Sequence, residues 1–208
     1  MIAEKTLQTA RKLMSKKSKG FIHGYNKEHG QRFEEVLAEI YNIRKQDGSL
    51  WMQDNNTAEI DFTQEMLQFS DLPEWVKESV GGLEVKLLAK GKHRSVKLGD
   101  AQNKANKLKQ GFVLCVGIYD EIPQNIVAIK FYKMEAEGKD RKAIRLAKMV
   151  NDFVKCKANP IKGIGGTREF VRDTTKQLDA SRFYFTDCSK TPTDYRQVQM
   201  VFRTFATA

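Results

Sequence analysis

The segment from Phe112 to Tyr119 most restricts the fold, because it is a nearly continuous run of eight apolar residues. Gly111 precedes the run and Asp120 follows it, so its length suits a β-strand better than a buried helix. A strand that is apolar on both faces lies in the interior of a sheet, with other elements covering both sides. The run therefore predicts a buried central strand.

Two other segments alternate apolar and charged residues, at 58–62 and 83–87. Successive side chains of a strand point to opposite faces, so Glu84 and Lys86 share one face of the second segment. Asp61 lies on the charged face of the first segment. If the two strands are neighbours with their polar faces aligned, these three side chains converge on one patch.

The tripeptide Glu-x-Lys is not specific by itself, because 30% of the residues are charged and Asp/Glu-x-Lys occurs three times. Only Glu84 and Lys86 lie within an apolar alternation, after the strand-entry break Gly81-Gly82. A solvent-facing ion pair on an amphipathic strand remains an alternative interpretation of these two residues.

Hydrophobic periodicity and turn residues predict the remaining elements. We expect helices at 2–16, 31–43, 100–110, 140–154 and 167–179, and strands at 49–53, 58–62, 82–88, 125–132, 182–186 and 196–205. Short helical turns are expected within 63–80, with Pro73 at a helix start. The order predicts an α/β or α+β fold: a mixed central β-sheet flanked by helices, with an N-terminal helix and a C-terminal helix and hairpin. We expect one domain over 1–208, with a core at about 30–132 and an extension at 140–208.

This order of elements, with an acid on the second strand and Glu-x-Lys on the third, resembles the PD-(D/E)XK nuclease superfamily. Type II restriction endonucleases are its best-known members. The resemblance implies that Asp61 is the family's single aspartate, and that Glu84 and Lys86 end its signature. It further assigns an acid on the first core helix, Glu34 or Glu35, and a polar neighbour after the third strand, Gln102.

The chain departs from the family pattern at two places. Ile60 stands where many members have proline, and the interval from Asp61 to Glu84 is long. That interval requires the helical insertion expected within 63–80. Without the insertion, Asp71 becomes a rival metal ligand.

The resemblance also implies a metal-dependent mechanism. Asp61, Glu84 and the backbone carbonyl of Val85 would present hard oxygen ligands of the kind that Mg²⁺ prefers. Lys86 would position the attacking water or stabilise the phosphorane, and its pKa would fall beside a metal. The acid on the helix would hold a second metal or orient a metal-bound water.

The formal net charge of +10 favours a polyanionic partner, chiefly nucleic acid, and the resemblance implies that this partner is double-stranded DNA. Basic residues cluster after the third strand, and the C-terminal hairpin offers side chains for base readout. The first set is Lys90, Lys92, His93, Arg94, Lys97, Lys104, Lys107 and Lys109, and the second is Arg196, Gln197, Gln199 and Arg203. The first set is equally consistent with an ordinary solvated surface, and half-polar edge strands show the same pattern as the second.

The sequence thus predicts an Mg²⁺-dependent DNA endonuclease, of the type II restriction kind, acting as a homodimer on a palindromic site. A junction-resolving or repair nuclease of the same fold is an alternative, and so is a non-enzymatic nucleic-acid-binding protein. The three cysteines lack metal-ligand spacing, and no apolar run approaches the ~20 residues that span a bilayer. We therefore expect a cytoplasmic protein without a membrane partner.

Overall fold

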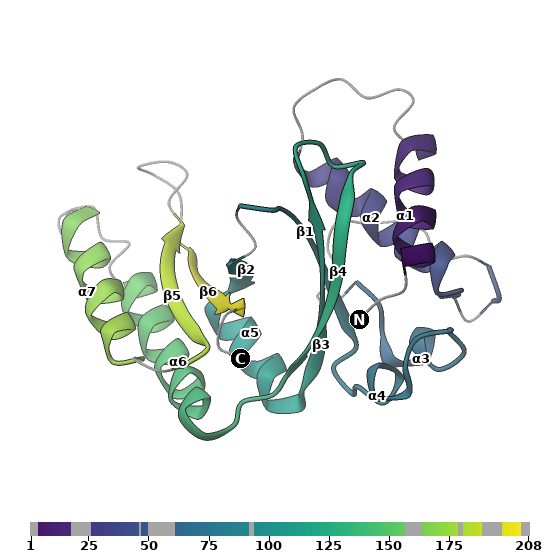
Figure 1. Ribbon diagram of the computed structural model, residues 1–208. Helices are drawn as coiled ribbons and strands as arrows, with labels where there is room; N and C mark the ends of the chain where they lie inside the picture. Colours follow the sequence, from purple (N-terminus) through teal and green to yellow (C-terminus); the bar gives the residue numbers. More distant parts are fainter. Residues whose placement is uncertain are drawn as a thin grey trace. The chain divides into compact units, whose positions relative to one another are not determined.

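The computed structural model describes residues 4–17, 26–45, 47–49, 61–91, 94–156, 164–178, 181–188 and 197–204 (Figure 1). The chain divides into two compact units. The first comprises residues 1–93 and 111–134, and the second comprises 94–110 and 135–208. This division cuts across the expected core of 30–132, because residues 94–110 group with the C-terminal residues. No helix in the described part of the chain is long and apolar enough to span a membrane.

The first unit is built on a three-stranded mixed sheet. Its strands are β1 (Leu83–Ala89), β3 (Phe112–Tyr119) and β4 (Ile126–Met134), in the order β1-β3-β4. β3 pairs in parallel with β1 and antiparallel with β4. Residues 112–118 are buried, so the predicted central strand is confirmed.

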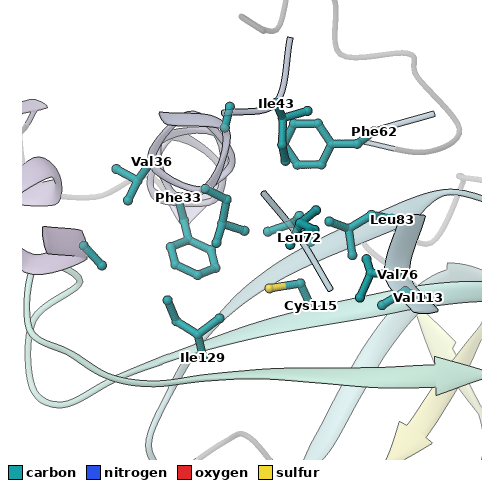
Figure 2. Packing of buried hydrophobic residues seen from close by; sticks show 14 of the residues in the cluster. Phe33, Val36, Ile43, Phe62, Leu72, Val76, Leu83, Val113, Cys115 and Ile129 are labelled. Carbon is teal, nitrogen blue, oxygen red and sulfur yellow. The ribbon is translucent and has the colours of Figure 1, made fainter. Parts of the chain in front are cut away.

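Helices α1 (Glu4–Lys17) and α2 (Asn26–Ile40) pack on this sheet, with α1 against β4 and α2 against β1. The core contains apolar residues of α2 together with alternate residues of β1 and β3 (Figure 2). These include Phe33, Val36, Leu37, Leu83, Val85, Val113 and Cys115. α2 buries residues at helical spacing, and β1 and β3 bury every second residue on the face toward α2. These two patterns together fix how α2 packs on the sheet.

Gly117 allows the close approach of α2 to β3. A Cβ added at Gly117 would lie 2.4 Å from Cζ of Phe33, whose side chain is fully buried. The ring therefore occupies the space that any larger residue at position 117 would need. Because Glu34 follows Phe33 directly, this contact also sets the position of Glu34.

The predicted helical insertion between Asp61 and Glu84 is confirmed by α3 (Gln64–Leu67) and α4 (Glu74–Lys77), with Pro73 as the N-cap of α4. Most of the expected strands at 49–53 and 58–62 lies outside the described residues. At the end of the second, Phe62 forms an antiparallel bridge with Leu83. The acid-bearing segment is therefore a neighbour of β1 at this point, as expected.

The second unit contains a three-stranded antiparallel sheet in the order β2-β6-β5. Its elements are β2 (Ser95–Asp100), α5 (Ala101–Gln110), η1 (Gly138–Asp140), α6 (Arg141–Cys156), α7 (Ile164–Lys176), β5 (Phe183–Cys188) and β6 (Gln197–Arg203). The two C-terminal strands pair as predicted, but in a sheet separate from the mixed one. β2 is not among the strands expected from the sequence, and its register shifts between Lys97 and Gly99.

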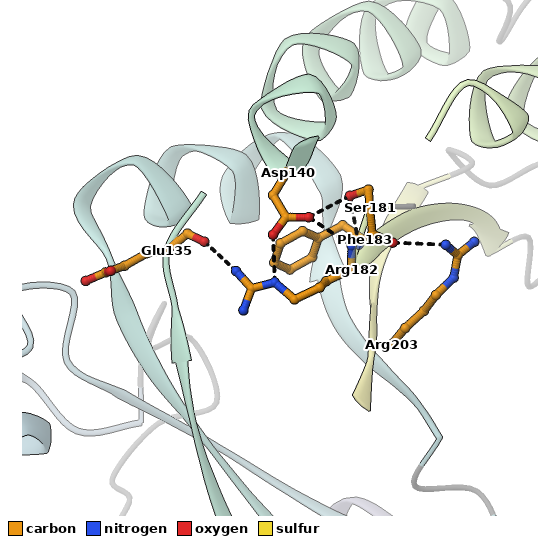
Figure 3. Close-up of polar contacts among 6 residues, drawn as sticks. All are labelled: Glu135, Asp140, Ser181, Arg182, Phe183 and Arg203. Carbon is orange, nitrogen blue, oxygen red and sulfur yellow. Dashed lines mark hydrogen bonds and ion pairs between the residues drawn. The ribbon is translucent and has the colours of Figure 1, made fainter. Parts of the chain in front are cut away.

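A buried carboxylate ties the start of α6 to β5 (Figure 3). Asp140 accepts hydrogen bonds from the Ser181 hydroxyl at 2.9 Å, from the Arg182 amide at 2.8 Å and from Arg182 Nε at 2.6 Å. Arg182 also donates to the carbonyl of Glu135 at 2.7 Å. The charge of Asp140 is thus compensated within the fold, and the orientation of α6 is fixed at its first turn.

We predict that Gly117→Ala lowers the free energy of unfolding by about 1–3 kcal/mol, because the new methyl group overlaps the Phe33 ring in a closely packed core. Urea denaturation followed by circular dichroism measures the change. Gly30→Ala on α2 is the matched control, since nothing lies within 4 Å of a Cβ there. Alanine at that helical position should stabilise the protein by up to about 1 kcal/mol. Equal stability of both variants would contradict the proposed packing.

Candidate functional site

Strand β1 carries two of the predicted site residues on one face. Leu83 and Val85 belong to the hydrophobic core, so the alternation of the strand turns Glu84 and Lys86 to the opposite face. There Lys86 Nζ lies 3.0 Å from Glu84 Oε1. The Glu84 side chain is 3% exposed, whereas the Lys86 side chain is one-third exposed. The pair is therefore a largely desolvated ion pair, not the solvent-facing pair of the alternative interpretation.

The register of the sheet explains why Glu84 is desolvated. In the parallel pairing of β1 with β3, Glu84 lies opposite Leu114 and Lys86 lies opposite Val116. Both apolar partners are fully buried. A carboxylate placed beside them loses water, and the ammonium group two residues along supplies the compensating charge.

Asp61 meets β1 at the edge opposite to β3. Its Oδ2 accepts a hydrogen bond of 2.6 Å from the amide of Val85. Two residues earlier on β1, Leu83 exchanges backbone hydrogen bonds with Phe62 at the same edge. Backbone groups of a strand alternate between its two neighbours, so the carbonyl of Val85 also points to the edge where Asp61 lies. Three predicted oxygen donors, from Asp61, Glu84 and Val85, thus belong to one short stretch of structure.

Glu34 is the acid that α2 contributes. It is buried, and its Oε2 has no hydrogen-bond partner. Burial, followed by the charge of Asp61 and more weakly by Glu35 and Glu84, raises the pKa of Glu34 to about 8, against the opposing charge of Lys86. The sequence left Glu34 and Glu35 as equal candidates. The structure brings Glu34 to the other site residues, while Glu35 is only partly buried.

Lys86 is surrounded by negative charge. Burial is the largest single influence and lowers its pKa, but the charges of Glu84, Asp61 and Glu34 and the hydrogen bond to Glu84 outweigh it, so the pKa is raised. The expected lowering of this pKa beside a metal is therefore not what the protein alone produces. A lysine that holds its proton can donate a hydrogen bond to a water molecule or a phosphate oxygen, and it is unsuited to act as a general base.

The donor set suits a hard divalent cation. No three Cys, His, Asp or Glu side chains of the described residues lie close enough together to hold a metal ion. Mg²⁺, however, needs only one or two carboxylates from a protein and keeps water or substrate phosphate in its remaining positions. Asp61, Glu84 and the Val85 carbonyl meet that requirement in kind. The unpartnered buried oxygen of Glu34 is a further group that a nearby cation would satisfy.

Two further residues concern the predicted chemistry. Asp71, the rival ligand, is exposed and follows α3, and the presence of the insertion removes the reason for considering it. Gln102 lies on α5 in the second unit, with Nε2 3.5 Å from Asn106 Oδ1. Its role beside the carboxylates stays a prediction.

The predicted DNA-contacting residues have different surroundings. Lys90 pairs with Asp120 at 2.9 Å, and Lys104 is buried. Arg94 and Lys97 are exposed at β2, and Gln199 is partly buried on β6. Lys92 and Arg196 lie outside the described residues. The continuous basic stretch in the sequence is therefore not a continuous exposed surface among these residues.

We predict that Glu34→Gln removes a pH dependence of stability that the wild type shows in EDTA. The pKa of Glu34 is about 8 in the folded protein against an ordinary value of 4.5, so between these values the folded state binds more protons than the unfolded state. The free energy of unfolding must then fall as pH rises through this window. The free energy of unfolding of the variant, relative to that of the wild type, should therefore rise by at least about 1 kcal/mol between about pH 5 and about pH 8.

Chemical denaturation at several pH values measures this gain. Glu39→Gln, on the exposed side of the same helix, is the matched control. A stability difference between Glu34→Gln and wild type that does not change with pH would contradict the buried, charge-coupled environment of Glu34.

Comparison with known proteins gives no relative on which to base an assignment. The chain has no significant match to a protein-family model, to a curated protein or to a solved structure. Any function must therefore be argued from the residues of the first unit and from the sequence resemblance stated above.

Proposed function

We propose that the protein is an Mg²⁺-dependent DNA endonuclease of the PD-(D/E)XK kind, most similar in role to a type II restriction enzyme. One observation carries the proposal: Glu34, Asp61, Glu84 and Lys86, from three separate segments, interact electrostatically in one cluster in which Glu34 and Glu84 are buried and the other two are partly exposed. Three carboxylates that share one lysine are costly to bring together away from water, so a structural role alone gives little reason for them.

Each residue has a role that follows from its position. Asp61 is oriented by the Val85 amide and would be one ligand of the cation. Glu84 is held by Lys86 at 3.0 Å and would be the second ligand, together with the carbonyl of Val85. Bound Mg²⁺ would polarise the scissile phosphate and neutralise the charge that develops on it.

Lys86 and Glu34 would act on the water and the phosphate. The ammonium group of Lys86, one-third exposed, can orient an attacking water or donate to a phosphate oxygen. Glu34 lies deeper and would bind a water molecule of the cation's shell or a second cation. Because its pKa is about 8 without a cation, ionisation of Glu34 and cation binding should favour each other.

DNA is the substrate that the charge of the chain favours. A formal net charge of +10 attracts a polyanion and accelerates its association. A two-fold homodimer would place two such sites on the two strands of a palindrome, as the restriction role requires. A junction-resolving or repair nuclease would use the same site on a different DNA structure.

We predict that the purified protein cuts plasmid DNA with Mg²⁺ and not with EDTA. Glu84→Gln and Lys86→Met should each reduce the cleavage rate by a factor of about 10² or more, because each removes a group that acts on the reacting phosphate or water. DNA binding by both variants should be largely retained. Gel electrophoresis of time courses measures cleavage, and a mobility shift measures binding.

The matched control is an ion pair of the same residue types in the same unit, Glu74 with Lys77 at 2.8 Å, in which the carboxylate is 72% exposed. Glu74→Gln and Lys77→Met should cut at the wild-type rate. Discrete fragments indicate a restriction enzyme, and a smear indicates a nonspecific nuclease. A mobility shift without any cleavage by the wild type would instead favour the non-enzymatic nucleic-acid-binding protein. Full cleavage by both site variants would refute the assignment of the site.

We further predict that Mg²⁺ or Ca²⁺ raises the melting temperature of the wild type, because a cation that binds only the folded state stabilises it. Asp61→Asn and Glu84→Gln should lose most of this increase, since each removes one ligand charge. Differential scanning calorimetry with and without the cation measures the effect. An increase that is unchanged in both variants would place the cation elsewhere on the protein.

A further inference from the structure

The exposed face of α6 is a concentration of positive charge that the proposed site does not use. Arg141, Lys142, Arg145 and Lys148 are all exposed on the first two turns. Of these, Lys148 pairs with Asp152 at 2.6 Å, and the described residues form no ion pair with the other three. Three uncompensated cations therefore lie within five residues of one helix.

The fold fixes which side of α6 faces outward. Ala143, Ala147 and Val150 are fully buried and recur at helical spacing. The helix packs on α5 and on β6 within the second unit. At the start of α6, Asp140 is hydrogen-bonded to Ser181 and ion-paired with Arg182 (Figure 3), so its negative charge does not offset the exposed cations. The positive end of the helix dipole adds to the same charge.

We propose that this face of α6 is a contact surface for the sugar-phosphate backbone of DNA, an inference that rests on DNA being the substrate of the proposed function. Arg141 and Lys148 are seven residues apart, or about 10 Å along the helix axis. That length corresponds to about three nucleotides of one DNA strand at 3.4 Å each. Arginine and lysine side chains on such a face bind phosphates without reading bases.

The composition of the face favours DNA over an anionic lipid surface. A helix that lies in a membrane interface exposes large apolar residues beside its basic ones. Among the described side chains of α6, Met149 is the one large apolar residue that is exposed, at 43%. α6 is also a better candidate than the basic stretch 90–109 that the sequence predicted to contact DNA. In that stretch Lys90 is paired with Asp120 and Lys104 is buried, so neither presents an unpaired charge at the surface.

The test is the salt dependence of DNA binding in EDTA, where cleavage is absent. In the triple variant Arg141→Gln, Lys142→Gln and Arg145→Gln, the slope of log K against log[salt] should decrease in magnitude by about 2–3, since each phosphate contact contributes about 0.9. Affinity for a short duplex at low salt should fall by a factor of about 10 or more. Fluorescence anisotropy of a labelled duplex measures both quantities.

The matched control removes the same charge from another exposed helix face, with Lys5→Gln, Lys12→Gln and Lys16→Gln on α1. This control should keep nearly the wild-type slope. An equal loss in both triple variants would show that only net charge matters, and an unchanged slope in the α6 variant would equally overturn the inference. The same holds if the α6 substitutions abolish binding to phosphatidylserine vesicles while DNA binding is unchanged.

The outcomes separate this inference from the proposed function. If the wild type cuts DNA and the α6 variant binds like the wild type, the inference fails and the nuclease proposal stands. If the wild type binds DNA through α6 and never cuts it, the nuclease proposal fails and the inference stands. If the wild type neither binds nor cuts DNA, both the nuclease proposal and the inference about α6 fail.

Discussion

The parallel pairing of β1 with β3 is the constraint from which the candidate site follows. It places Leu83 and Val85 in line with Val113 and Cys115, in the core beneath α2. The period of the strand then leaves Glu84 and its neighbour Lys86 no place except the opposite face. Because β3 occupies one edge of β1, the other edge is where Phe62 pairs and where Asp61 reaches the amide of Val85.

The charges of the cluster define what the site can do without a cation. Three carboxylates share one ammonium group, and the pKa values show how the imbalance is resolved: that of Glu34 rises to about 8, and that of Lys86 rises as well. The protein alone thus retains a proton on Glu34 at neutral pH, and so lowers the negative charge of the cluster. In the proposed function, a divalent cation would supply the same compensation to the whole cluster and release that proton.

Most elements with a strong local pattern could be predicted from the sequence. Elements whose formation depends on pairing with a distant strand were predicted less well. The run from Phe112 to Tyr119 was assigned to its observed limits, and α5 and α6 were each predicted to within two residues of theirs. β2 was missed because its alternation of Val96 and Leu98 with polar residues is short and is broken by Gly99, which has a φ of +111°. Such a strand is stabilised mainly by pairing with β6, which no local pattern reveals.

The same distinction applies to the site. Alternation alone was enough to place Glu84 and Lys86 together, because strand period is a local property. Selecting Glu34 over Glu35 was not possible from sequence, since both flank the apolar stripe of α2, and the choice depends on Phe33 lying over Gly117. For the basic residues, the sequence pattern alone is a poor guide to exposed charge. The dense basic run after β1 includes Lys104, which is buried, and Lys90, which is paired with Asp120. The cations of α6 are less conspicuous in the sequence but share one exposed face. Charge density along a chain therefore indicates a polyanion-binding surface only after burial and pairing have been taken into account.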